Sequence, residues 1–165
     1  MKVSRRHWLQ LALAAGASAL ERPRSASARN VVGFVGVYQP GTIVIVTHMR
    51  ELYFVLDGGQ AIRYPVGVGR AGMAWHGRAF VARKLVQPAW SANPGVTPKI
   101  PGGSARNPMG AAVLGLNHGN YAIHGTNDPS SIGGYVSHGC IRMHNEDVMD
   151  LYQRAPLGTE VYVLR

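Results

Sequence analysis

The segments Tyr121-Ala-Ile-His-Gly-Thr126 and Val136-Ser-His-Gly-Cys-Ile-Arg-Met143 surround the single cysteine of this 165-residue chain. Cys140 follows a glycine, a histidine lies two residues before it, and His124 lies sixteen residues upstream. A cysteine attacks as its thiolate, and a nearby imidazole can accept the thiol proton. The pattern indicates a thiol acyl-transfer enzyme, although composition alone leaves a buried structural cysteine or an intermolecular linker open.

The residues around Cys140 predict a tight, glycine-containing turn shortly before a helix. Gly139 allows the backbone to approach a substrate, and the N–H groups of Gly139 and Cys140 could face a developing oxyanion. Two histidines are candidates for the general base. His138 is close in sequence, but residues two positions apart need not present their side chains to one another. We therefore favour His124 as the base and His138 as a neighbour that orients or stabilises.

A metal site is a second possible use of these side chains. His124, His138, Cys140 and His144 match no standard zinc spacing, and the chain has no second cysteine. We therefore predict no metal ion and no other cofactor.

Residues 1–28 predict an export signal that is not part of the fold. Ser4-Arg-Arg-His-Trp-Leu-Gln10 resembles the twin-arginine signal, and Ala26-Ser-Ala28 fits a small-residue cleavage site. The apolar run 11–20 is too short and too weakly apolar for a stable membrane span. We expect export to the periplasm or cell envelope by the twin-arginine route; an ordinary Sec signal or an uncleaved anchor would also fit the pattern.

Composition and charge restrict the partners of the exported protein. The chain is 46% hydrophobic and carries a net charge of +9, with 17 basic and 8 acidic residues. Without residues 1–28, 12 basic and 7 acidic residues remain, a net charge of +5. The remaining positive charge is scattered and forms no basic stripe interleaved with aromatic residues, which argues against nucleic acid. A mildly cationic exported domain suits an anionic polymer such as the cell wall.

The mature chain reads as one mostly β domain, because 21 Gly and 10 Pro favour short strands and many turns. Residues 29–41 are expected to be an N-terminal linker before a domain over 42–165. One helix is expected over 145–154, with Asn145 as its N-cap. Residues 86–110 are too rich in proline and glycine for a regular element and predict a lid or binding loop. Strands are expected at 42–47, 51–56, 60–67, 79–85, 111–116, 120–124 and 159–164.

These segments together resemble the L,D-transpeptidase catalytic domain of the YkuD type, which acts on bacterial peptidoglycan. The resemblance runs from about Thr42 to Leu164. Its most specific parts are Ile123-His-Gly-Thr-Asn127, Ser131-Ile-Gly133 and Ser137-His-Gly-Cys-Ile-Arg-Met143. Further segments that carry it are Tyr64-Pro-Val-Gly-Val-Gly69, Ile100-Pro-Gly-Gly-Ser104, Asn107-Pro-Met-Gly110 and Pro156-Leu-Gly-Thr-Glu-Val161.

The resemblance implies a β-sandwich of mixed sheets with a long lid and one or two short helices. It implies Cys140 as the nucleophile and His124 as the base, with the Gly125 carbonyl as the acceptor that orients the imidazole. The resemblance also implies that Ser137, His138 and Gly139 shape the oxyanion region. It implies that Arg142 and Tyr121 bind substrate. Arg142 would hold the motif or contact an anionic part of the stem peptide.

One segment departs from the family pattern. Similar domains have Thr-Pro and a glycine just before the strand that corresponds to Phe80–Lys84. In this chain Trp75-His76 replaces Thr-Pro, and Arg78 stands at the glycine position. The departure concerns a local turn and the adjoining cleft wall, and it does not touch the nucleophile or the base.

The implied reaction is an acyl transfer in two steps on peptidoglycan stem peptides. Cys140 forms a thioester with a tetrapeptide stem and releases the terminal D-Ala; an amine on a second stem or a wall-anchored protein then makes the new amide. An L,D-carboxypeptidase or crosslink-cleaving hydrolase would use the same acyl-enzyme with water. Two different classes of protein stay open at this point, a non-catalytic wall-binding module and a redox or metal protein. We expect a monomer.

Overall fold

The computed structural model describes residues 29–92 and 99–165. The expected export signal, residues 1–28, lies outside the described residues, as does the part of the expected lid over 93–98. In the described residues the protein is mostly β, with mixed sheets, one α-helix and one 3-10 turn, as the sequence predicted. No helix in the described part of the chain is long and apolar enough to cross a membrane.

Nine strands of the described chain form one mixed sheet, and half of the neighbouring strand pairs are also consecutive in sequence. Antiparallel pairs build most of it, while β11 pairs parallel with β2 and β10 pairs parallel with β8. In sheet order the strands are β1 (Asn30–Gly33), β4 (Gln60–Pro65), β3 (Glu51–Val55), β2 (Ile43–Val46), β11 (Glu160–Leu164), β6 (Gly77–Val86), β7 (Ala112–Leu116), β8 (Ala122–His124) and β10 (Ile141–Arg142).

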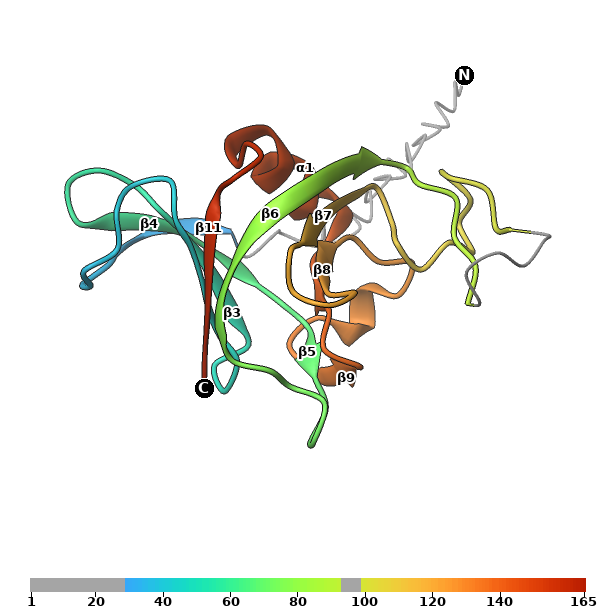
Figure 1. Ribbon diagram of the computed structural model, residues 1–165, viewed down its shortest axis with the longest axis horizontal. Coiled ribbons are helices and arrows are strands. Elements are labelled where there is room, and N and C mark those ends of the chain that lie inside the picture. The colour runs from blue at the N-terminus through green and yellow to red at the C-terminus, as the bar shows by residue number, and fades with distance from the viewer. Residues whose placement is uncertain (1–28, 93–98) are drawn as a thin grey trace, which may run out of the picture.

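The strand β6 joins the two halves of this sheet. Its first part pairs with β11, its second part pairs with β7, and the register shifts between Val81 and Arg83. Such a bulge bends a strand and increases its twist. Figure 1 shows β6 as a long curved strand between the half that contains β3 and β4 and the half that contains β7 and β8. The apolar residues of both halves meet in one core, which includes Ile43, Leu114 and Ile123.

The helix α1 (Asn145–Arg154) packs against β7 and β8 and buries Val148 and Leu151. It begins at Asn145 as expected, but His144 occupies the N-cap position and no side chain caps the helix. The expectation that Asn145 is the N-cap is therefore wrong. Its side chain instead forms hydrogen bonds with the backbone of Ala111 and Thr126 in the loops beside the helix.

Four short strands were not predicted. Asn30–Gly33 lies in the expected linker but pairs with β4 as β1, so the sheet starts before Thr42. β5 (Val68–Gly69) pairs in parallel with β9 (Tyr135–Ser137), and β10 has only two residues. Segments of two to four residues carry no recognisable alternation, and their pairing partners are distant in sequence. A 3-10 turn over Pro129–Ser131 precedes β9.

Candidate active site

The pairing of β8 with β10 places His124 and Cys140 on one side of the sheet. Ile141 lies beside Ile123 in the parallel register, and both side chains are buried in the core. Because side chains alternate along a strand, His124 and Cys140 project away from that core. Cys140 directly precedes β10 and thus lies level with Ala122, two residues from His124 along β8 and on the side of the sheet that His124 faces.

The sulfur of Cys140 lies at the edge of β8, and the side chain is partly exposed. Burial raises the pKa of the thiol, while the backbone N–H of Ala122, which donates to the sulfur, and the positive charge of Arg142 lower it. Burial is the largest of these influences, so the resting group is the thiol. A reaction at this sulfur therefore requires a base that removes the proton.

His124 is buried, with a relative exposure of 3%. Its ring Nδ1 lies 2.6 Å from the carbonyl oxygen of Gly125. Since a carbonyl can only accept, Nδ1 carries the proton and Nε2 is the unprotonated nitrogen. The Gly125 carbonyl thus has the orienting contact that the family resemblance implied for it.

The surroundings of His124 keep its ring neutral. Burial lowers the pKa of the imidazole from 6.5 to about 4, and the positive charge of Arg142 acts in the same direction. Hydrogen bonds to the carbonyls of Gly125 and Pro108 favour the protonated ring and offset part of this shift. At neutral pH the imidazole is therefore uncharged, with Nε2 able to accept a proton and two carbonyls placed to stabilise the imidazolium.

The turn that precedes Cys140 is held by the hydroxyl of Ser137. This hydroxyl donates to the Cys140 carbonyl at 2.6 Å and accepts the Gly139 N–H at 3.0 Å. The Gly139 N–H, one of the two donors expected to face an oxyanion, is thus bonded inside the turn. The Cys140 N–H is the remaining candidate from the pair.

Tyr121 supports the turn at Gly139. Gly139 has φ +122°, a conformation that favours glycine, and a Cβ there would lie 2.3 Å from the Tyr121 ring. Arg142 is the direct neighbour of His124 in the strand register. The structure thus places both residues, which the sequence assigned to substrate binding, beside Cys140 and His124.

His138 points away from the buried side of the turn and is exposed. The guanidinium of Arg70 donates to its Nε2. Since that nitrogen accepts a hydrogen bond from a permanent cation, His138 is occupied as an acceptor on the outer side of the turn. This arrangement fits a neighbour that supports the turn better than it fits a base. Arg70 had no signal in the sequence.

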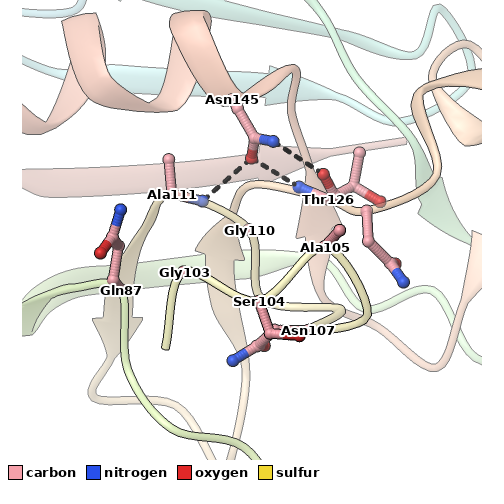
Figure 2. A pocket seen from close by; sticks show the side chains of 10 residues that line it. Gln87, Gly103, Ser104, Ala105, Asn107, Gly110, Ala111, Thr126 and Asn145 are labelled. Carbon is pink, nitrogen blue, oxygen red and sulfur yellow. Dashed lines mark hydrogen bonds between the residues drawn. The ribbon is translucent and has the colours of Figure 1, made fainter. Parts of the chain in front are cut away.

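Asn145 holds two loops together behind His124. Its side-chain oxygen accepts the N–H groups of Ala111 at 2.9 Å and Thr126 at 3.1 Å, and its amide donates to the Thr126 carbonyl at 2.9 Å. Figure 2 shows these bonds at the wall of a pocket of about 180 Å³, which Ser104 and Asn107 also line. Because Thr126 follows Gly125, Asn145 fixes the peptide that orients the imidazole.

We expect Asn145→Ala to destabilise the fold by about 2 kcal/mol, because three hydrogen bonds to loop backbone are lost. We also expect slower acyl transfer, since the Gly125 carbonyl is no longer fixed. Chemical unfolding and turnover measure the two effects. Asn127→Ala is the matched control: its amide makes one bond, to the Arg106 carbonyl, on the exposed side of the same loop. Equal destabilisation by both substitutions would contradict the role assigned to Asn145.

The described parts of the lid are held by a buried asparagine. The amide of Asn107 donates to the carbonyls of Pro88 at 2.8 Å and Pro101 at 3.1 Å, so it joins the two ends of the segment. A backbone bridge between Trp90 and Ile100 adds to this connection. The next residue, Pro108, contributes the carbonyl that faces His124. The predicted lid therefore reaches the candidate base.

No group of three or more His, Cys, Asp or Glu side chains that could hold a metal ion occurs among residues 29–92 and 99–165.

Two proteins of similar sequence carry names that refer to L,D-transpeptidases. YqjB of Bacillus subtilis, named as a candidate L,D-transpeptidase, is 36% identical over 132 residues, which cover 75% of this chain and 72% of YqjB. ErfK/SrfK of Escherichia coli K12, named a probable L,D-transpeptidase, is 34% identical over 139 residues and covers 75% of this chain. This chain spans only 44% of the length of ErfK/SrfK.

Solved structures share the fold. L,D-transpeptidase 3 from Mycobacterium tuberculosis, with a faropenem-derived adduct, has a TM-score of 0.60 and 18% identity over 75% of this chain and 60% of its own. An L,D-transpeptidase from Stackebrandtia nassauensis has a TM-score of 0.56 and 23% identity over 75% and 55%. Residues 40–163 match the sequence model of the YkuD family, described as the L,D-transpeptidase catalytic domain. The chain therefore belongs to the YkuD family of L,D-transpeptidase catalytic domains.

Proposed function

We propose that this protein is a peptidoglycan L,D-transpeptidase that uses Cys140 as its nucleophile and His124 as its base. The observation that supports the proposal is the parallel pairing of β8, which ends at His124, with β10, which directly follows Cys140. The family membership supplies the reaction class. The proposed donor is a tetrapeptide stem, attacked at the L,D bond between its third and fourth residues.

The proton path follows from the state of the two groups. Cys140 is a thiol at rest and His124 is a neutral acceptor, so the thiol proton passes to the imidazole as the sulfur attacks the carbonyl carbon. The S–C bond forms, the C–N bond breaks, and D-Ala leaves after its nitrogen takes the proton from the imidazolium. A thioester remains on Cys140. The Gly125 and Pro108 carbonyls support the imidazolium during this transfer.

In the second step an amine attacks the thioester. His124 removes a proton from the amine, the new amide forms, and the thiol is regenerated. The proposed acceptor is the side-chain amine of a second stem or of a wall-anchored protein. Water as the acceptor would give an L,D-carboxypeptidase or a crosslink-cleaving hydrolase, and cleft shape and water access decide between these outcomes. The proposed setting is the periplasm or cell envelope, reached by the twin-arginine route.

The test is incubation with a disaccharide-tetrapeptide followed by mass analysis of protein and products. We expect loss of D-Ala, an acyl adduct on Cys140, and a crosslinked dimer. Free tripeptide without dimer would show hydrolysis as the reaction. An unreacted stem, together with a thiol that does not react with alkylating reagents at neutral pH, would favour a non-catalytic wall-binding module and overturn the proposal.

A further inference from the structure

Trp75 lies in the loop between β5 and β6, where the chain departs from the family pattern, and it contacts the turn that carries the nucleophile. Its indole N–H donates to the Gly139 carbonyl at 3.1 Å. The two residues are 64 positions apart in sequence. Gly69 allows the approach, because a Cβ at that position would lie 2.8 Å from the backbone of Ala74.

The indole also covers two other rings. Its centroid lies 4.6 Å from that of His118 and 5.4 Å from that of Tyr121, and the centroids of His118 and Tyr121 are 5.7 Å apart. If three parallel rings stacked in one column, the centroids of the two outer rings would be about twice as far apart as those of neighbouring rings. The nearly equal distances therefore mean that the three rings form a triangular cluster in which the indole stacks on both His118 and Tyr121. Tyr121 in turn contacts Gly139.

Trp75 thus holds the Gly139 peptide directly through its N–H and indirectly through Tyr121. The carbonyl and the N–H of a trans peptide point in opposite directions. A Gly139 carbonyl fixed by the indole therefore directs the Cys140 N–H away from Trp75. The Gly139 N–H is already bonded to Ser137. Of the donors in this turn, the Cys140 N–H is consequently the one whose direction is set by Trp75.

We propose that Trp75 is a positioning residue that orients the Cys140 N–H toward the oxyanion formed when the Cys140 sulfur attacks a carbonyl. Donors aimed in advance at a developing oxyanion accelerate acyl transfer because no reorganisation is needed at the moment of reaction. The inference rests on the proposed function only in naming Cys140 as the nucleophile. Where similar domains have Thr-Pro, this chain therefore has a tryptophan that supports the oxyanion side of the site.

The test uses two reactions of the same sulfur. With p-nitrophenyl acetate, the sulfur attacks a carbonyl, an oxyanion forms, and p-nitrophenolate leaves as the thioester is made. With iodoacetamide, the sulfur displaces iodide at a saturated carbon and no oxyanion forms. Trp75→Phe keeps an aromatic ring but removes the indole N–H. We expect this variant to be acylated about 5- to 10-fold more slowly, with alkylation rates within about twofold of wild type.

Tyr162→Phe is the matched control, because it removes one aromatic donor from a bond to Glu160 on β11 and leaves the turn intact. It should match wild type in both reactions. Trp75→Leu is a second variant, which removes both ring and donor and should slow acylation at least as much as Trp75→Phe. Thermal unfolding identifies the folded variants. Acylation of either folded variant at the wild-type rate, or an equal slowing of both reactions, would overturn the inference.

Failure of the proposed function gives a different result. In that case the wild-type protein is acylated by the ester, Trp75→Phe is slower, and neither protein releases D-Ala from a tetrapeptide stem. The role of Trp75 then stands, while the proposed substrate class does not.

Discussion

Cys140→Ala is expected to reduce acyl transfer from tetrapeptide stems by at least about 1,000-fold, because the proposed reaction has no other nucleophile. Cys140 is the single cysteine of the chain, so no second thiol can replace it. The side chain is partly exposed, and the change from thiol to methyl removes one atom. We therefore expect the variant to fold with nearly unchanged thermal stability and to form no acyl adduct.

Cys140→Ser gives the sharper version of the same test. A hydroxyl is a far weaker nucleophile at neutral pH than a thiol, but it keeps a proton that His124 can accept. We expect Ser at this position to give no turnover above that of Cys140→Ala while binding the stem with unchanged affinity. Mass analysis and equilibrium binding measure the two quantities. Crosslinked stems produced by folded Cys140→Ala would contradict Cys140 as the nucleophile.

The sequence predicted the long elements of the fold because their signals are local. The β-rich run over β3 and the turn Asp57-Gly58-Gly59 before the returning strand predict a hairpin, which forms with Phe54 beside Ile62. Both turn glycines have φ +69°, the conformation that such a turn requires. The helix over 145–154 likewise follows from its apolar face and from Pro156 just after it.

The candidate site depends on contacts that the sequence does not contain. β10 has two residues, and only its pairing with β8 puts the segment that begins with Cys140 alongside the strand that ends at His124. Asn145 satisfies the rule for an N-cap, but tertiary contacts direct its amide to Ala111 and Thr126. Trp75 looks like a departure from a family motif until the fold brings it to Gly139. The sequence therefore predicts which residue types form the site. It does not predict their contact partners, because strand register and loop packing determine these.

His124→Gln is expected to lower kcat/KM by roughly 100- to 10,000-fold, the range for loss of a positioned general base. The effect is large here because burial keeps the Cys140 thiol protonated, so attack depends on a base. Glutamine keeps a polar side chain of similar size that can still donate to the Gly125 carbonyl. The wild-type rate itself should hold from pH 8 down to pH 5 and fall only toward pH 4, where His124 becomes protonated.

The same residue makes stability depend on pH, and the sign follows from its two pKa values. The unfolded chain binds a proton at the ordinary value of 6.5, whereas the folded protein binds it only near 4. Between these values the unfolded state holds more protons, so the free energy of unfolding falls as the pH falls. The contribution of His124 leaves the free energy of unfolding at its full value above pH 6.5. About 3 kcal/mol of this free energy is lost by pH 4.

His124→Gln separates the two effects, since glutamine does not titrate. Urea unfolding at pH 7 and at pH 4.5 should show a smaller loss of stability for the variant than for wild type, while turnover is low at both values. His48→Gln is the control, because His48 is exposed in the turn between β2 and β3. It should keep wild-type turnover and the wild-type dependence of stability on pH. Loss of turnover with an unchanged dependence on pH would mean that His124 is not held neutral by burial, and the proton path from Cys140 would have to start from an ion pair.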